Sequence, residues 1–526
     1  MADFDLVLRR GIIYDGTGGS PLRGDVGIRS GRIASLGVDL SGAETFDCDG
    51  LCVTPGFIDT HAYSDLAALD PEPTLECKVR QGVTLDVIGQ DGLGVAPLRT
   101  GDVDARREQL KVLRGNPDVD WSWRSFASWC DALDQARAAL DLACLVPHGA
   151  VRESIIGLSD RPAAPHDIFR MKGLLARSLD EGAFGVSFGL AYPPGCFAQR
   201  DELVELAGVA ASRHVPIVVR LRTEAEGAVE ALGELLSIGR ESGAHVHLAH
   251  LKLSGQASWS RLPQLLETLA RAQKDGVEVS ADAYPYTAGQ VMLATLLPAW
   301  AHQGGAKGMA QRLADPAARK QIKAYLASPG SLWRACGPEN IVLWSLPSGR
   351  ADLNGMDLSA AAQAAGKDPT DFALDLLRDE PPGVCLVCRD QSEDVLEKLL
   401  SLSCLNISGG ALPGGRPHPR SFGAFPRVLA RYVRERHVLT LEQAVRKMTG
   451  LPADIFGLDD FGYLVEGKRA NVVVFEPEVV RDVATFEEPE RFAEGVRHVL
   501  VGGKMVVRDG KLTGERPGRV ARRRRS

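Results

Sequence analysis

The sequence lacks the long apolar and basic segments that mark membrane and secreted proteins. No stretch of its 526 residues approaches the roughly 18 uninterrupted apolar residues that would span a bilayer. The N-terminus has no basic segment followed by a long apolar one, as a secretory signal would. The ten cysteines are scattered, some in apolar runs such as those around Cys144 and Cys404, without the spacing of a disulfide framework. These absences predict a cytoplasmic protein with reduced cysteines and no membrane association.

The chain also has little excess charge of either sign. Its 61 Lys and Arg residues stand against 68 Asp and Glu residues, which gives a net charge of −7, and the basic residues are spread along the chain. A nucleic-acid-binding protein concentrates its basic residues on one face. We therefore expect a small-molecule substrate and no nucleic-acid partner, and we leave open whether the chain forms a homo-oligomer. With 44% hydrophobic and 25% charged residues, the composition is that of an ordinary globular protein.

Short alternating strands are predicted at both ends of the chain. Residues 4–8 and 25–28 near the start, and 470–475 near the end, are β-rich and are separated from their neighbours by turn residues. An all-β beginning and an all-β end around a different middle part favour a small β-sandwich built from both ends. We expect its N-terminal part over residues 1–54, and its C-terminal part with the tail over 463–526.

Apolar runs of strand length alternate with amphipathic helical stretches through the middle of the chain. Residues 83–88 and 278–282 are two such runs. The alternation predicts an α/β protein whose parallel strands close into a (β/α)8 TIM-type barrel over 55–462, with insertions near 98–140 and 287–380. An open doubly wound sheet is the structural alternative, and it is disfavoured because no glycine-rich phosphate fingerprint follows the first strand. In a barrel the catalytic groups lie at the carboxyl ends of the strands.

The first predicted barrel strand ends in the motif Pro-Gly-Phe-Ile-Asp-Thr-His-Ala-Tyr, residues 55–63. His61 and Tyr63 point to one face, because side chains alternate along a strand. This motif resembles the metal-binding first strand of the amidohydrolase superfamily, in which two histidines one residue apart bind the metal. Six further motifs, in the same order, narrow the resemblance to the N-acyl-D-amino-acid deacylase group over nearly the whole chain: residues 81–92, 190–195, 248–252, 282–286, 418–427 and 447–453.

The resemblance places the metal ligands of that group on particular residues of this chain. The two first-strand histidines match His61 and Tyr63, and the bridging cysteine matches Asp91. The two later histidines match Arg220 and His250. Only some of these residue types are metal ligands, so the resemblance implies a degenerate metal site.

Two matched positions have lost the chemistry that the deacylase group uses. Zinc takes three or four imidazole, thiolate or carboxylate ligands at about 2 Å, whereas the Arg220 guanidinium stays protonated and has no lone pair to donate. The catalytic aspartate of the group matches Gly409, which has no side chain to act as a general base. We therefore predict no cofactor. Any zinc that did bind would be held weakly, by His61, Asp91 and His250.

Arg220 could instead replace the metal electrostatically, by charge-assisted hydrogen bonds to a carboxylate or a developing oxyanion. His250 or His61 would then act as acid or base, with Asp91 orienting one of them. These four residues are the candidate catalytic groups. Polar residues in the matching motifs form the candidate substrate-binding set: Tyr63, Tyr192, Arg222, Lys252, Tyr284, Ser408, His418 and Arg420.

The leading prediction is an enzyme of the deacylase group that acts on an amide or other C–N bond of a small, carboxylate-bearing N-acyl amino-acid-like substrate, without a competent zinc centre. Hydrolysis, acyl transfer, cyclisation and elimination stay open. One alternative is a conventional zinc-dependent N-acyl-D-amino-acid deacylase, and another is a non-catalytic binding protein on the same fold. His245 and His247, which share one face of the strand before His250, are interpreted as sheet-face residues.

Overall fold

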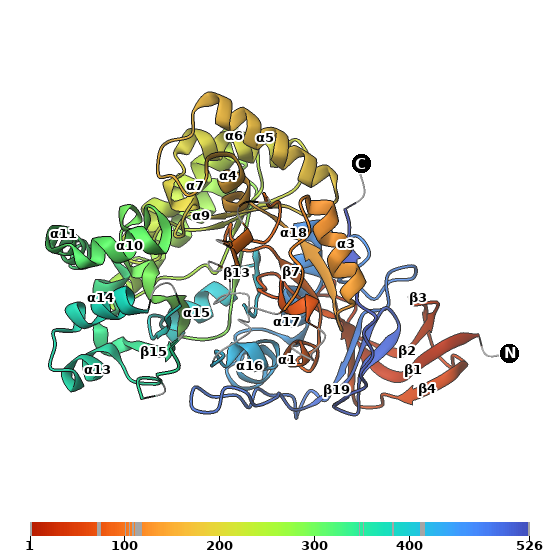
Figure 1. Ribbon diagram of the computed structural model, residues 1–526. Helices are drawn as coiled ribbons and strands as arrows, with labels where there is room; N and C mark the ends of the chain where they lie inside the picture. Colours follow the sequence, from red (N-terminus) through yellow and green to blue (C-terminus); the bar gives the residue numbers. More distant parts are fainter. Residues whose placement is uncertain are drawn as a thin grey trace.

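The two ends of the chain pair with each other in a nine-stranded sheet in the computed structural model (Figure 1). Strand β5 pairs antiparallel with β18, with Thr54 opposite Val473, and this pairing joins the N-terminal and C-terminal strands. The strands are β1 (Phe4–Ile13), β2 (Leu22–Arg29), β3 (Arg32–Gly37), β4 (Gly42–Asp47), β5 (Cys52–Pro55), β18 (Val472–Phe475), β19 (Val496–Val501), β20 (Lys504–Arg508) and β21 (Lys511–Leu512). The strands predicted at both ends therefore lie in one sheet.

The structure describes the whole chain except residues 1–2, 71–74, 100, 102, 105, 108–109, 111–117, 347, 351, 381–382, 411–415 and 524–526. The middle of the chain contains two parallel sheets, with strand orders β17-β13-β12-β11-β10-β9 and β22-β8-β7-β6. Their strands are β6 (Phe57–Asp59), β7 (Val83–Ile88), β8 (Asp141–Cys144), β9 (Val146–Pro147), β10 (Val186–Gly189), β11 (Ile217–Arg220), β12 (Val246–Leu248), β13 (Val279–Ala283), β17 (Leu405–Ile407) and β22 (Val520–Ala521).

These two sheets meet at both of their boundaries. Only Leu145 separates β8 from β9 along the chain. At the other boundary, the Asn406 side-chain amide donates to the Thr60 hydroxyl at 2.6 Å, and the Gly409 N–H donates to an Asp59 carboxylate oxygen at 2.8 Å. The carboxyl ends of the parallel strands are therefore gathered in one region, where loops such as 61–66, 89–95 and 249–255 begin. The chain thus has an α/β architecture with mixed sheets.

Amphipathic helices cover the parallel strands and the rest of the middle part. Helix α9 shows the pattern clearly, because its buried Leu265, Leu269 and Ala272 recur at helical spacing. The helices are α1 (Glu76–Val79), α3 (Phe126–Ala136), α4 (His148–Ile156), α5 (Pro165–Asp180), α6 (Arg200–Ala211), α7 (Ala228–Ser242), α8 (Gln256–Trp259), α9 (Leu262–Lys274), α15 (Glu393–Leu400), α16 (Arg420–Arg427), its π-helical continuation (Val428–Glu435), α17 (Leu441–Met448) and α18 (Gly450–Phe456).

A separate lobe lies between β13 and α15 and projects from one side of the molecule (Figure 1). It holds a three-stranded sheet, β14 (Gly289–Met292), β15 (Ile341–Ser345) and β16 (Cys385–Cys388), with β16 in the centre. Its helices are α10 (Gly305–Ala314), α11 (Pro316–Leu326), α12 (Leu332–Cys336), α13 (Leu358–Ala364) and α14 (Pro369–Asp379). Residues such as Leu313, Ile322 and Leu386 form a hydrophobic core of its own.

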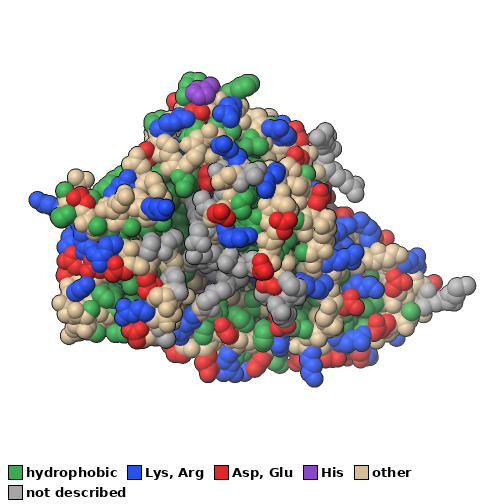
Figure 2. Space-filling view, in the orientation of Figure 1, with side chains coloured by type: hydrophobic (Ala, Val, Ile, Leu, Met, Phe, Trp, Pro, Cys, Tyr) green, Lys and Arg blue, Asp and Glu red, His purple; other side chains and the backbone are tan. Residues whose placement is uncertain are grey.

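The surface carries both signs of charge. On the face drawn in Figure 2, Lys and Arg side chains are interspersed with Asp and Glu side chains. Among the helices in the described ranges, none combines the length and the apolar character needed to cross a bilayer.

Candidate functional site

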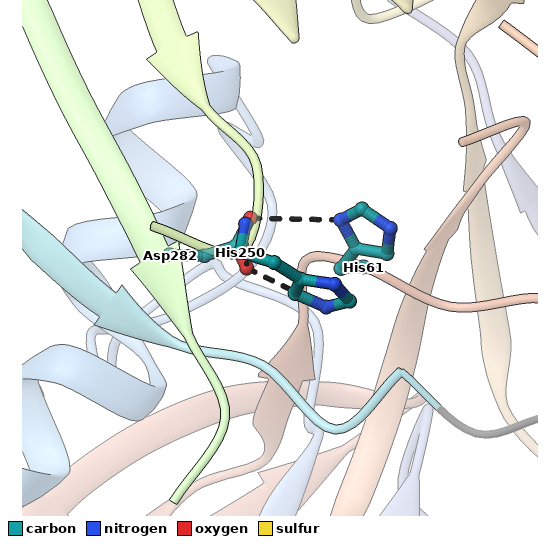
Figure 3. A group of neighbouring side chains, drawn as sticks. All are labelled: His61, His250 and Asp282. Carbon is teal, nitrogen blue, oxygen red and sulfur yellow. Dashed lines mark hydrogen bonds and ion pairs between the residues drawn. The ribbon is translucent and has the colours of Figure 1, made fainter. Parts of the chain in front are cut away.

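Three buried side chains meet at the carboxyl ends of the parallel strands (Figure 3). His61 follows β6, His250 follows β12, and Asp282 lies in β13. The His61 Nδ1 atom is 3.7 Å from one oxygen of Asp282, and the His250 Nε2 atom is 3.8 Å from the other. Neither ring nitrogen has a hydrogen-bond partner among the described residues. Unpartnered buried nitrogens of this kind are costly, so a polar group of a ligand would complete the site.

The two imidazoles are held differently although they touch. Their ring centroids are 3.7 Å apart and their planes are inclined by 24°. Burial lowers the pKa of His61, but the charges of Asp91 and Asp282 outweigh it, so the His61 pKa lies above its usual value. Burial and the neighbouring charge of His61 hold the pKa of His250 well below its usual value. A pair whose pKa values are driven apart suits one proton donor and one proton acceptor.

Asp91 joins the cluster through the Tyr63 hydroxyl. The Tyr63 hydroxyl donates to an Asp91 oxygen, and it lies 3.0 Å from the His61 Nε2 atom. Burial would raise the pKa of Asp91, but Arg220 and His61 outweigh it and hold that pKa well below its usual value, so the group is a carboxylate. Gly189 allows this packing, because a Cβ atom at Gly189 would lie 1.7 Å from the Asp91 carbonyl oxygen.

Two of the clustered residues have strained backbones. Asp91 has φ of 61° and His250 has φ of 50°, both in the left-handed region. A β-carbon makes this region unfavourable by about 1–2 kcal/mol per residue. Strained residues of this type concentrate at functional sites, where the surrounding structure enforces the conformation.

Arg220, the last residue of β11, turns its guanidinium into the cluster. Its Nη1 atom is 3.7 Å from an Asp91 oxygen, and its Nε atom is 3.2 Å from a Glu224 oxygen. The guanidinium also lies over the Tyr192 ring, 5.5 Å from its centroid. Only 5% of the Arg220 surface is exposed. A permanent positive charge is therefore fixed between two carboxylates beside the imidazoles.

Two further cations, Lys252 and Arg420, contact Tyr284, whose ring packs against His250. Lys252 is paired with Glu224 at 3.1 Å and with Asp390 at 3.3 Å, and it donates to the Tyr284 hydroxyl. The Arg420 guanidinium lies over the ring of the same tyrosine, 4.5 Å from the Tyr284 ring centroid. No ion pair joins Arg420 to a carboxylate in the part of the chain that the structure describes, and its Nε atom has no hydrogen-bond partner there.

Three of the predicted substrate-binding residues use their side chains to hold other parts of the protein. They are Arg222, Ser408 and His418. Arg222 points away from the cluster, to Glu234 and to backbone carbonyls of residues 196 and 198. The Ser408 hydroxyl donates to Asp282 at 2.7 Å. His418 lies near the Ala288 carbonyl oxygen and accepts from the Arg420 backbone N–H. The predicted residues that gather around the two imidazoles and Asp282 are Tyr63, Asp91, Tyr192, Arg220, Lys252, Tyr284, Ser408 and Arg420.

Four buried charged residues were not among the predicted site residues: Lys78, Glu224, Asp282 and Asp390. Lys78 is fully buried between Asp59 and Asp86, and Asp59 in turn accepts from the backbone N–H groups of His61 and Gly409. A Cβ atom at Gly409 would lie 2.6 Å from an Asp59 oxygen, so a side chain at this position would clash with Asp59 in the observed structure. Asp282 lies in the motif of residues 282–286, and Glu224 lies four residues after Arg220; these positions near strand ends were the available signal.

An apolar pocket of about 370 Å³ opens beside Tyr192. Its walls come from the 190–193 loop and from the lobe between β13 and α15, including Met292, Thr295 and Met309. Because Tyr192 also lies beneath the Arg220 guanidinium, the pocket is next to the charged cluster.

Comparison with known proteins identifies the family. The model of the amidohydrolase family matches residues 44–326 and 416–507, and the chain belongs to this family. A D-aminoacylase from Alcaligenes xylosoxydans xylosoxydans is 34% identical over 99% of this chain and 98% of its own length. An N-acyl-D-glutamate deacylase from the same organism is 35% identical over 99% of this chain and 96% of its own. The chain is thus a D-aminoacylase-like amidohydrolase.

Solved structures agree with this family and with the fold. N-acyl-D-glutamate deacylase from Bordetella bronchiseptica, complexed with zinc and a phosphonate inhibitor, superposes with a TM-score of 0.83 at 33% identity, covering 99% of each chain. A D-aminoacylase with a binuclear metal centre gives a TM-score of 0.84 at 32% identity, covering 99% of this chain and 100% of the other. The amidohydrolase-type fold is therefore confirmed.

Oxygen and nitrogen atoms of His61, His250 and Asp282 lie within 4.8 Å of one another, so these three side chains form a possible metal site. In the observed arrangement the two imidazole rings are stacked, with their centroids 3.7 Å apart and their planes inclined by 24°. The Arg220 guanidinium adds a fixed positive charge beside Asp91.

Proposed function

We propose that this protein cleaves the C–N bond of a small N-acylated, carboxylate-bearing amino-acid-like substrate, with Arg220 in the place of a catalytic metal cation. The observation that supports this proposal is the buried ion-pair arrangement of Arg220 between Asp91 and Glu224. A guanidinium in a water-poor site stabilises a developing oxyanion strongly, because little solvent competes with it. We also propose that the two parallel sheets close into an eight-stranded barrel and that the terminal strands form the adjoining β-sandwich.

The proposed hydrolysis uses the two imidazoles as an acid and a base. His250, with its lowered pKa, is neutral near pH 7, and its unpartnered Nε2 atom accepts a proton from the attacking water. The water oxygen bonds to the amide carbon, and the resulting oxyanion faces the Arg220 guanidinium. His61, with its raised pKa, donates a proton to the leaving nitrogen as the C–N bond breaks. His250 then releases its proton to the solvent and His61 takes one up, so both imidazoles return to their starting protonation states.

Arg420 is the proposed anchor for the substrate carboxylate. Its guanidinium is buried and carries no protein ion pair among the described residues, whereas Arg220 and Lys252 are already paired. A buried unpaired cation gains most from an anionic ligand group. The apolar pocket beside Tyr192 then receives the acyl chain or the side chain of the substrate.

A zinc-dependent deacylase is the second candidate, favoured by the zinc-containing N-acyl-D-glutamate deacylase structure and by the short distances among His61, His250 and Asp282. In that case His61, His250 and Asp282 would hold the ion. When bound, zinc would polarise the substrate carbonyl and lower the pKa of a water molecule.

Metal content and turnover distinguish the two candidates. The protein is purified under zinc-replete conditions, analysed for zinc by mass spectrometry, and assayed with a panel of N-acetyl-D-amino acids before and after treatment with a chelator. Our proposal predicts substoichiometric zinc and chelator-resistant turnover. One tightly held zinc per chain, with turnover that chelator abolishes and zinc restores, would refute it. An Arg220→His variant that gains zinc would show that the guanidinium is what keeps the metal out.

A further inference from the structure

A line of hydrogen bonds runs behind Asp282, on the side away from the two site imidazoles. It begins at His245, just before β12, and continues through neighbouring strands β12 and β13. The Ser280 hydroxyl lies 2.8 Å from the His245 Nε2 atom and 2.8 Å from the His247 Nδ1 atom. The His247 Nε2 atom is 3.2 Å from an Asp282 oxygen. Residues 245, 247, 280 and 282 can form this line because alternate residues of parallel strands share a face.

The other contacts of Asp282 fix the direction of the last hydrogen bond. Its side chain acts as a hydrogen-bond acceptor in both of them, because its Oδ1 atom accepts from the His250 backbone N–H and from the Ser408 hydroxyl. An ionised carboxylate only accepts hydrogen bonds. The His247 Nε2 atom must therefore carry a hydrogen and donate it to Asp282.

The positions of the other hydrogens in this line follow from the hydrogen on the His247 Nε2 atom. In a neutral His247 ring the Nδ1 atom has no hydrogen, so it accepts the hydroxyl hydrogen of Ser280. The Ser280 oxygen then accepts from the Nε2–H group of His245. Burial lowers the pKa of His245 to about 4, so this ring is also neutral near pH 7 and has one N–H group to give. Every hydrogen in the line points toward the site.

The hydrogen bond from His247 matters because the other contacts of Asp282 are with the site residues. Its Oδ1 atom accepts from the backbone N–H of His250 at 3.1 Å and from the Ser408 hydroxyl. The same carboxylate faces the unpartnered ring nitrogens of His61 and His250. For its Oδ2 atom, His247 supplies the one hydrogen bond found within the described ranges. Without that bond only the Oδ1 side of the carboxylate is held by hydrogen bonds, and both imidazoles face a less firmly fixed neighbour.

We propose that His247 is a positioning residue, kept by Ser280 and His245 in the tautomer that donates to Asp282, and that it fixes the orientation of the two imidazoles through this carboxylate. The sequence analysis interpreted His245 and His247 as sheet-face residues, and the proposal gives them a role in the reaction. It rests on the proposed function, since the imidazoles matter only if they carry the proton transfers.

Steady-state kinetics test the proposal with graded variants. Ser280→Ala removes the hydroxyl that selects the His247 tautomer, and we expect kcat to fall about tenfold with KM within twofold, the scale of lost outer-sphere hydrogen bonds. His247→Gln keeps an amide donor toward Asp282 and should lose less activity than His247→Leu. The matched control is His498→Gln, a buried histidine of β19 in the other sheet, which should keep the wild-type kcat. Wild-type kcat in Ser280→Ala and His247→Leu, or a change in KM alone, would overturn the proposal.

A second measurement does not depend on turnover. In protein labelled with ¹⁵N-histidine, NMR shifts of the ring nitrogens report which one carries hydrogen, and His247→Gln assigns the signal. We expect a protonated Nε2 and an unprotonated, hydrogen-bonded Nδ1 in the wild type, and a changed Nδ1 shift in Ser280→Ala. Hydrogen on Nδ1 instead would overturn the positioning role. Absence of turnover in the wild type, with the expected NMR pattern, would count against the proposed function only.

Discussion

Replacing Arg220 by methionine should weaken both the fold and the reaction. The substitution keeps much of the side-chain volume but removes the charge that lies 3.2 Å from Glu224 and 3.7 Å from Asp91. At an effective dielectric constant near 20, each pair carries about 5 kcal/mol of gross attraction. The net loss of stability is smaller than this gross attraction, because the variant no longer carries the cost of removing a guanidinium from water. Removing one partner of a buried pair costs about 3–5 kcal/mol net.

We expect a loss of about 3 kcal/mol in the free energy of unfolding at pH 7, the lower end of that range. The two carboxylates keep other partners, because Glu224 retains Lys252 and Asp91 retains the Tyr63 hydroxyl. Urea unfolding followed by circular dichroism measures the change. Turnover of the best N-acetyl-D-amino acid should fall by about 10²–10³, as when an oxyanion-stabilising donor is removed.

The pH dependence of this loss is a further check. In the wild type the depressed pKa of Asp91 contributes stability above the unfolded carboxyl pKa of about 3.9 and loses it as pH falls toward the folded value. In the variant Arg220 no longer opposes the effect of burial, so the pKa of Asp91 is higher than in the wild type. The difference between wild type and variant should therefore shrink below about pH 4.

A surface arginine serves as the control for this experiment. Arg213 pairs with Asp180 at 2.8 Å where both side chains are partly exposed, so Arg213→Met should cost less than about 1 kcal/mol. Arg220→Lys keeps a charge and should recover part of the lost stability. An Arg220→Met protein that unfolds at the wild-type urea concentration at pH 7, with unchanged turnover, would refute the reasoning.

Three further substitutions test other parts of the site. Arg420→Met should raise KM for carboxylate-bearing substrates about tenfold to a hundredfold, since a hydrogen bond to a charged group contributes about 1.5–3 kcal/mol. The free energy of unfolding should change little, because the substitution leaves no carboxylate unpaired among the described residues. Equal KM values in both proteins would contradict the assigned role. Lys78→Met should cost about 3–5 kcal/mol in urea unfolding because Asp59 and Asp86 then lack their cation, and Asp59→Asn in the same chain should return part of it. His250→Gly should be more stable than His250→Ala by about 1 kcal/mol, because only glycine adopts a φ of 50° without strain; the reverse order in urea would show that the left-handed conformation is not enforced.

The family and much of the site follow from the sequence alone. The motif ending at His61 and Tyr63, together with six later motifs, identified the amidohydrolase family that the comparisons confirm. The same motifs selected His61, Asp91, Arg220 and His250, which the fold brings into one cluster. Their residue types alone also show what each can do, since a guanidinium has no lone pair for a metal and a glycine has no general base.

The tertiary structure decided which partner each charged group has. Arg222 lies two residues beyond Arg220, yet it pairs with Glu234 outside the cluster, and Asp282 became a site residue only through its contacts with residues that follow other strands. The physical reason is that chemistry is a property of the residue, whereas burial, pKa and orientation depend on atoms brought together from distant parts of the chain. Sequence therefore determined the family and the reactive groups, and the packing of strand ends determined that His61 and His250 stack on each other beside Asp282 with opposite pKa shifts.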